Sequence, residues 1–185
     1  NSTASVAGAS RPCGVVIARC EALVICVAAD ADVLEVVDAL LPTIRHGTLV
    51  LDTSTTAAAT AREAAARLAA RGAEFLDCPV SGGVEGARDA RLAIMCGGHP
   101  LAFERAHTVL GSLGRTVTWF GESGAGQAAK ATNQIMCAGI IRAVGEAMAF
   151  AAAQGLPLQK VVDTLGQGAG SSWYFVHRAP NMIKG

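Results

Sequence analysis

Along the first part of the chain, apolar residues alternate between short continuous runs and longer stretches with helical spacing. The continuous run at 22–27 is typical of a strand that is buried on both faces, as in a parallel sheet. In the stretch 30–41, apolar residues recur every three or four positions, which predicts a helix. We predict strands at 22–27, 48–52, 74–78, 92–98 and 115–120, and helices at 30–41, 57–70 and 100–113. Strands that alternate with helices predict an α/β fold with a mostly parallel sheet.

The pattern changes near residue 123, after which we predict helices only. An Ala-rich run without proline follows and ends before Gly155, which predicts one long helix with a C-terminal stop. The helices predicted in this part are 127–154, 157–165 and 173–183. The change divides the chain into two predicted domains, an α/β domain at 1–123 and an all-helical domain at 124–185.

Composition narrows the classes of function. The sequence is 51% hydrophobic, which is enough for a sizeable core, and its formal net charge is zero. A neutral chain without a long basic run is not expected to bind nucleic acid as its main partner. The six cysteines include no Cys-x-x-Cys pair and none lies at ligand spacing from a histidine. This favours buried, reduced thiols in a cytosolic protein over disulfides or a metal site. We expect no membrane partner, because the apolar strand runs are short and the long helix carries Arg142 and Glu146.

A polar trio occupies the start of the long helix. Lys130, Asn133 and Gln134 share one helical face. The positive end of the helix dipole attracts an anionic ligand and disfavours the charge on Lys130, which would suit this lysine to proton exchange near neutral pH. The preceding Gly124 and Gly126 would let the backbone pass close to a ligand. The spacing by itself equally fits an exposed lysine beside two amides.

Two loops follow predicted strands at the edge of the sheet where ligands bind in open α/β folds. The loop at 53–56, Thr-Ser-Thr-Thr, offers hydroxyl groups and backbone N–H groups at a helix start, although simple helix capping explains it equally well. The loop Ser81-Gly82-Gly83 offers a hydroxyl group and side-chain-free amides that could bind an anion. A plain turn explains this loop equally well.

Three motifs occur in order along the chain. They are Asp-Thr-Ser-Thr-Thr at 52–56, Asp-Cys-Pro-Val-Ser-Gly-Gly at 77–83 and Gly-x-Gly-x-x-x-Lys-x-x-Asn at 124–133. With these motifs the chain resembles the β-hydroxyacid dehydrogenase family, which includes 3-hydroxyisobutyrate dehydrogenase, tartronate semialdehyde reductase and L-threonate dehydrogenase, with 6-phosphogluconate dehydrogenase more distant. The resemblance covers nearly the whole chain. It implies a partial Rossmann-type, dinucleotide-binding domain, followed by a long interdomain helix and a partial all-helical domain for substrate binding and dimerisation.

The resemblance also implies roles for individual residues. Lys130 would be the general acid/base, which protonates the carbonyl oxygen during reduction or accepts the hydroxyl proton during oxidation. The residues that would bind the substrate are Ser81, Gly82, Gly83, Asn133 and Gln134. The residues that would line the nicotinamide cofactor are Val27, Ala28 and Thr56.

The family opens with a strand and the motif Gly-x-Gly-x-x-Gly, which holds the pyrophosphate of the cofactor. No such motif precedes Asn1, and the chain ends at Gly185 within the predicted helical domain. We therefore expect a fragment of a longer enzyme that enters the dinucleotide domain just after its second strand. Many NADP-using relatives place an arginine at that point, where this chain has Ser2, and this favours NAD over NADP.

The expected function is hydride transfer between a nicotinamide cofactor and a small 3-hydroxy acid, or its semialdehyde or keto form, in a cytoplasmic homodimer or homotetramer. Three alternatives stay open: an enzyme like 6-phosphogluconate dehydrogenase, an enzyme like imine reductases, and a non-catalytic fold relative or inactive fragment. Lys130 and Asn133 disfavour the last two, because imine reductases usually lack this lysine and a non-catalytic relative has no need of the pair.

Overall fold

The computed structural model of the chain describes residues 3–6 and 20–184. Contacts between residues divide the chain into two compact units, Asn1–Ala131 and Thr132–Gly185. The division falls inside the long helix α6 (Ala125–Ala153), a little after the boundary near residue 123 that composition predicts. Ser2, on which the preference for NAD depends, lies outside the described residues.

Seven strands of the described residues form one sheet in the first unit, in the order β1-β2-β3-β4-β6-β5, with β7 also paired to β6. The strands are β1 (Thr3–Val6), β2 (Ala22–Ile25), β3 (Leu49–Asp52), β4 (Glu74–Asp77), β5 (Val80–Ser81), β6 (Leu92–Gly98) and β7 (Gly114–Gly121). Strands β1 to β4 pair in parallel, and so do β6 and β7. Only the pairs β4–β6 and β5–β6 of this sheet are antiparallel, so the prediction of a mostly parallel sheet is confirmed.

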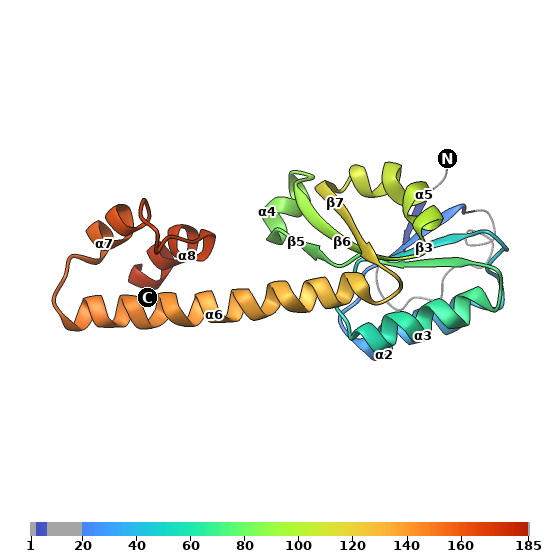
Figure 1. The fold of residues 1–185 in the computed structure, drawn as a ribbon, viewed down its shortest axis with the longest axis horizontal. Helices are drawn as coiled ribbons and strands as arrows, with labels where there is room; N and C mark the ends of the chain where they lie inside the picture. Colours follow the sequence, from blue (N-terminus) through green and yellow to red (C-terminus); the bar gives the residue numbers. More distant parts are fainter. Residues whose placement is uncertain (1–2, 7–19, 185) are drawn as a thin grey trace. The chain divides into compact units, whose positions relative to one another are not determined.

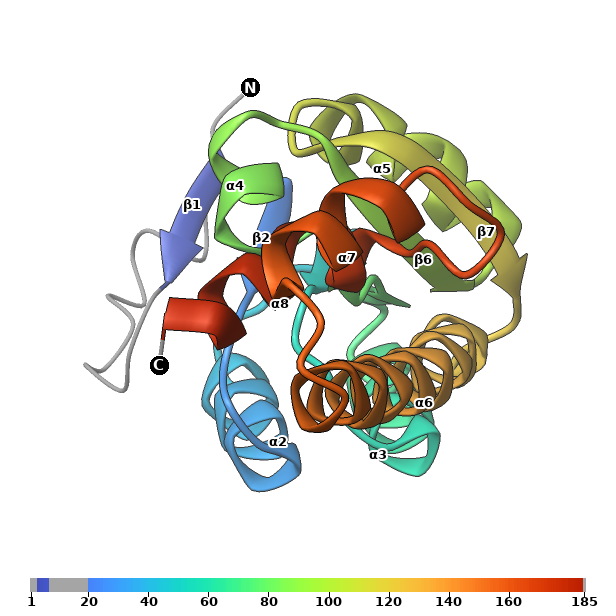
Figure 2. The ribbon, with the colours of Figure 1, turned by 90° about the vertical axis from the view of Figure 1, so that its left-hand side faces the viewer.

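Helices cover both faces of this sheet (Figures 1 and 2). They are α2 (Asp30–Leu40), α3 (Ala58–Ala69) and α5 (Pro100–Gly111). Val50 and Phe75 pack with α2 and α3 on one face, whereas their neighbours Leu49, Leu51 and Leu76 pack with α5 on the other. Successive residues of a strand point to opposite faces, so a strand covered on both sides is apolar at every position. This explains the continuous apolar runs of the sequence.

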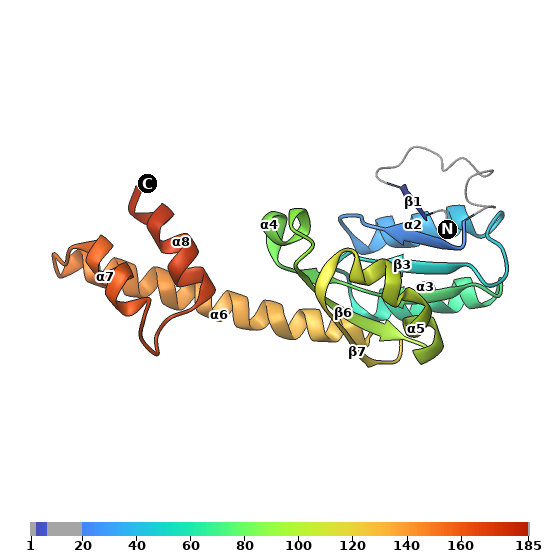
Figure 3. The same cartoon turned by 90° about the horizontal axis from the view of Figure 1, so that it is seen from above.

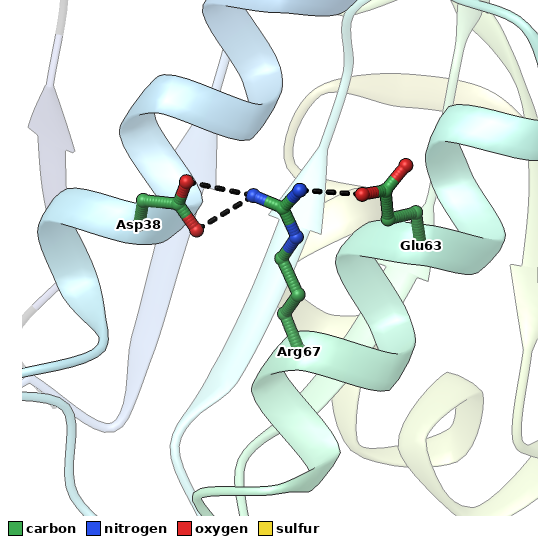
Figure 4. A network of polar contacts seen from close by, with 3 residues as sticks. All are labelled: Asp38, Glu63 and Arg67. Carbon is green, nitrogen blue, oxygen red and sulfur yellow. Dashed lines mark hydrogen bonds and ion pairs between the residues drawn. The ribbon is translucent and has the colours of Figure 1, made fainter.

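Polar contacts join α2 to α3 on the surface. Arg67 of α3 donates from Nη1 to both carboxylate oxygens of Asp38 at 2.7 Å, and also contacts Glu63 one turn earlier (Figure 4). At the other end of the helices, Asp30 accepts hydrogen bonds from the Thr60 hydroxyl at 2.5 Å and from the Ala57 N–H at 2.8 Å. The hydroxyl of Thr60, helped by the Ala57 amide, lowers the pKa of Asp30.

The Pro-Val-Ser-Gly-Gly stretch contains two short elements that the hydrophobic pattern does not predict. Strand β5 pairs antiparallel with β6, with Val80 opposite Ile94, and α4 (Gly83–Arg88) follows at once. Between them Gly82 has φ +143°, in a region of backbone conformation that favours glycine. The loop that the sequence suggests is therefore the end of a short strand followed directly by a short helix.

The second unit contains the remainder of α6 together with α7 (Leu158–Leu165) and α8 (Trp173–Lys184), which pack against it (Figure 3). Buried apolar residues from all three helices form one cluster, which contains Val144, Met148, Val162, Phe175 and Ala179. By length and composition, α6 is the one helix of the described residues that could cross a membrane. This is weak evidence, because the core helix of a soluble protein passes the same test. Helix α6 also carries the ion pair Arg142–Glu146 at 2.9 Å.

Candidate active site

The loop after β3 is tied to the end of β2 by buried polar groups. The Ser54 hydroxyl oxygen accepts a hydrogen bond from the Val27 N–H at 2.9 Å, and the Ser54 N–H donates to Asp52 Oδ1 at 2.9 Å. Asp52 is completely buried, and burial raises the pKa of its carboxyl group against the lowering effect of its bonds to Ser54. These bonds hold the loop at 53–56 at the carboxyl edge of the sheet, where the sequence predicts a ligand.

Asp77, at the end of β4, caps the start of α6. Its carboxyl oxygens accept hydrogen bonds from the backbone N–H groups of Gly124 at 2.7 Å and Gln127 at 2.9 Å. Burial raises the pKa of Asp77, while the N–H groups of Gly124 and Gln127 oppose that rise. A side chain of the protein thus occupies the positive end of the helix, where the sequence suggests an anionic ligand.

The glycines at the start of α6 allow the helix to begin directly against the sheet. A Cβ atom on Gly126 would lie 2.6 Å from the carbonyl oxygen of Asp77 and still closer to that of Met95. A Cβ atom on Gly97 of β6 would lie 2.7 Å from the backbone nitrogen of Gly126. The space that the glycines leave open is therefore filled by protein backbone, and the prediction that they make room for a ligand is revised.

Gln127 joins α6 to the loop after β3. Its side chain is almost completely buried, with 2% exposure. The side-chain Nε2 donates to the Ser54 carbonyl oxygen at 2.9 Å, and Oε1 accepts from the Thr56 N–H at 3.0 Å. Thr56 also carries a buried hydroxyl oxygen with no hydrogen-bond partner among the described residues.

Lys130 lies one turn further along α6. Its side chain is only 9% exposed, and Nζ donates to the Val80 carbonyl oxygen at 2.8 Å. Val80 precedes Ser81 in β5, so the ammonium group contacts the strand that leads into the Ser81-Gly82-Gly83 turn. In that turn Ser81 is half-buried and both glycines are exposed.

The other residues predicted for the site have more open environments. Of the cofactor residues, Val27 is half-buried and Ala28 is exposed. Asn133 and Gln134 belong to the second unit, where Asn133 Nδ2 donates to Gln134 Oε1 at 3.1 Å and to Cys137 Sγ at 3.5 Å. No group of three or more His, Cys, Asp or Glu side chains in the described part of the chain could hold a metal ion.

Sequence reasoning missed Asp77 and Gln127, which make most of the buried hydrogen bonds around Lys130. Both residues stand inside the motifs, at the first position of Asp-Cys-Pro-Val-Ser-Gly-Gly and next to the Gly-x-Gly. Two signals could have identified them. Asp77 is a carboxylate that ends an apolar strand, and Gln127 is an amide in a helix that begins against a sheet. Polar groups in such places need buried partners.

Comparison with known proteins gives two adjoining family matches. Residues 3–121 match the NAD binding domain of 6-phosphogluconate dehydrogenase, and residues 124–185 match the NAD-binding domain of NADP-dependent 3-hydroxyisobutyrate dehydrogenase. L-threonate dehydrogenase of Escherichia coli is 39% identical over 77% of this chain and 47% of its own length. 3-Hydroxyisobutyrate dehydrogenase of Pseudomonas aeruginosa is 38% identical over 74% of this chain and 46% of its own length.

Among solved structures, the chain is similar to 3-hydroxyisobutyrate dehydrogenase of Mycobacterium tuberculosis with L-serine. The TM-score is 0.82 at 33% identity, and the match covers 91% of this chain and 58% of that one. The chain spans about half the length of the curated relatives it matches.

Proposed function

The chain belongs to the β-hydroxyacid dehydrogenase family, and from this premise we propose that the protein transfers a hydride between a nicotinamide cofactor and a small 3-hydroxy acid. The oxidised form of the substrate is the corresponding semialdehyde or keto acid. The observation that carries the proposal is the position of Lys130, a residue only 9% exposed whose Nζ lies 2.8 Å from the Val80 carbonyl oxygen beside the Ser81-Gly82-Gly83 turn.

In the proposed reaction Lys130 is the general acid/base. During oxidation its amine accepts the proton of the substrate hydroxyl group, and during reduction its ammonium group donates a proton to the carbonyl oxygen. The cofactor, when bound, supplies the hydride chemistry. The hydrogen bond to Val80 restricts where Nζ can lie, and such restriction is needed because a general acid acts only within hydrogen-bond reach of the reacting oxygen.

The substrate carboxylate binds at the Ser81-Gly82-Gly83 turn in this proposal. A hydroxyl group and backbone amides without side chains form a suitable anion site. Asn133 and Gln134, which follow Lys130 on α6, orient the rest of the substrate through hydrogen bonds. The names of the relatives support a small hydroxy acid as the substrate class.

We assign the nicotinamide cofactor to the carboxyl edge of β2 and β3, with Val27, Ala28 and Thr56 along it. The buried hydroxyl oxygen of Thr56, which lacks a partner among the described residues, fits such a site because buried polar groups normally have one. We propose NAD over NADP, and a cytoplasmic homodimer or homotetramer. Large apolar side chains on the second unit, such as Ile135 and Phe150, are exposed and suit a contact between copies.

A second candidate is the oxidation of 6-phosphogluconate, because residues 3–121 match the NAD binding domain of that dehydrogenase. The test is an assay of the full-length gene product with NAD and with NADP against 3-hydroxyisobutyrate, L-serine, L-threonate and 6-phosphogluconate. We expect turnover of one or more of the first three, faster with NAD. Turnover of 6-phosphogluconate alone would favour the second candidate. No turnover with any combination of cofactor and substrate would favour a non-catalytic relative.

Replacing Lys130 tests its role. Lys130→Met keeps most of the side-chain length and removes the exchangeable proton, so kcat should fall by about 10²- to 10⁴-fold while the Kd of the cofactor changes little. Lys160→Met, at an exposed lysine of α7, is the matched control and should leave kcat unchanged. Equal turnover in Lys130→Met and the wild type would remove Lys130 from the chemistry.

A further inference from the structure

Gln127 makes three hydrogen bonds to other parts of the first unit. Its backbone N–H donates to Asp77 at the end of β4, and its side-chain amide bonds to Ser54 and Thr56 in the loop after β3. All three bonds lie between 2.9 and 3.0 Å, and the side chain is 2% exposed. A single residue therefore fixes the first turn of α6 against both a strand and a loop.

The side-chain amide fits its surroundings in one orientation only. Its NH₂ group faces the Ser54 carbonyl oxygen, which accepts, and its oxygen faces the Thr56 N–H, which donates. An amide supplies both a donor and an acceptor, whereas an ionised carboxylate supplies acceptors only and a thioether supplies no donor. The need for both a donor and an acceptor therefore restricts the side chains that fit at position 127 more than burial alone would.

The hydrogen bonds of Gln127 connect the residues proposed for hydride transfer with the residue proposed for proton transfer. Thr56 lies on the loop assigned to the nicotinamide cofactor, and Lys130 lies one turn after Gln127 on the same helix. Resting on the proposed function, we infer that Gln127 is a positioning residue that sets the separation between the cofactor loop and the acid/base Lys130. Hydride and proton transfer both require this separation to be held, since an error of about 1 Å can cost about 100-fold in rate.

The test compares kinetics of the full-length protein with Gln127→Met, which removes both side-chain hydrogen bonds at similar length. We expect kcat per folded enzyme to fall about 10- to 100-fold, with the KM of the hydroxy acid within about twofold of wild type. The deuterium isotope effect on kcat with substrate labelled at the reacting carbon should increase, because hydride transfer becomes slower than product release. A purely structural role would lower the folded fraction and leave kcat per folded enzyme unchanged.

Gln127→Glu sharpens the test through pH. At high pH the introduced carboxylate cannot donate to Ser54, but once protonated it again offers one donor and one acceptor. The ratio of its kcat to that of wild type should therefore rise as pH falls. The titratable and charged groups in and around this region are Asp77, Asp52, Lys130 and Arg62. Taking the ratio to wild type removes the titrations that the two proteins share. A ratio that stays constant with pH would contradict the inference.

Thr60→Val is the matched control. Thr60 is also buried in the first unit, but its hydrogen bond goes to Asp30 of α2 and not to Ser54, Thr56 or Asp77. We expect it to lower stability without changing kcat. An equal fall in kcat for Thr60→Val and Gln127→Met would overturn the positioning role, and so would normal kcat in Gln127→Met alongside an inactive Lys130→Met. A wild-type protein without dehydrogenase activity would overturn both the inference and the proposed function.

Discussion

The two units of the chain are stabilised by different kinds of contact. The first unit holds every polar or charged residue that is buried among the described residues, including Asp52, Asp77, Gln127 and Lys130. The second unit is built around an apolar cluster of three helices, and its ion pair Arg142–Glu146 lies on the surface. The contrast runs through a single helix, because α6 begins in the first unit and ends in the second.

The contrast shows where contacts fix the positions of helices and side chains, in addition to stabilising the fold. Apolar burial is non-directional, so the cluster around Phe175 can tolerate small shifts of its helices. A buried hydrogen bond fixes distance and angle, and a buried polar group without its partner is costly. In the first unit such buried polar groups lie at the start of α6, where the proposed chemistry requires Lys130 to be held in place.

The largest expected effect comes from one substitution made at two places in α6. Gly126→Ala would force a Cβ atom against the carbonyl oxygens of Met95 and Asp77, and should reduce the free energy of unfolding by about 3 kcal/mol. Gly139→Ala, where nothing lies within 4 Å of the added Cβ, should increase it by about 0.5–1 kcal/mol because alanine is the better helix residue. Chemical denaturation of each variant measures both changes.

Opposite signs in the two parts of one helix would support the contrast between the units. A Gly126→Ala protein as stable as wild type would show that the start of α6 can move away from the sheet. The close packing around Asp77 would then not fix the position of the helix.

The next effect is a dependence of stability on pH that arises in the first unit. Burial raises the pKa of Asp52 in the folded state, so the native protein holds this proton more tightly than the unfolded chain does. The stabilisation is complete below the unfolded pKa of about 4 and is lost as pH rises through the higher native pKa. Asp52→Asn removes the titration, so its free energy of unfolding should fall less than that of wild type as pH rises.

Denaturation curves between about pH 4 and pH 8 check this difference, with the ordinary aspartate pKa near 3.9 as the lower reference. Asp52→Asn keeps a side-chain oxygen for the Ser54 N–H, so the variant is a close match to the native geometry. Parallel curves for the two proteins would show that Asp52 does not titrate differently in the folded state.

The smallest effect is expected at the surface network of Arg67, Asp38 and Glu63 (Figure 4). These groups are solvated and screened by salt, so their pairing adds little to stability even though Nη1 of Arg67 contacts both carboxylate oxygens of Asp38. Arg67→Gln should leave the Tm within experimental error of wild type. A large fall in Tm would mean that surface as well as buried polar contacts fix the first unit.

The sequence predicted the elements because their signals are local. The continuous apolar run of β2, the helical spacing of α2 and the uninterrupted Ala-rich run of α6 each depend on residues within a few positions of one another. The motifs also indicated Lys130 and the Ser81-Gly82-Gly83 turn as parts of one site, through family resemblance. Strands β1 and β5 and helix α4 were missed, and β5 shows why, because two residues carry no periodicity.

What only the tertiary structure decided is which groups satisfy the buried polar atoms. Asp77 reaches α6 across 50 positions of sequence, and Gln127 reaches Ser54 across 73. No local pattern encodes such partners, because a buried amide or carboxyl group can be satisfied by any donor or acceptor that the fold brings near. The sequence by itself therefore indicated most of the strands and helices and the residues capable of the chemistry. The folded chain decided which buried side chains fix the start of α6, and with it Lys130.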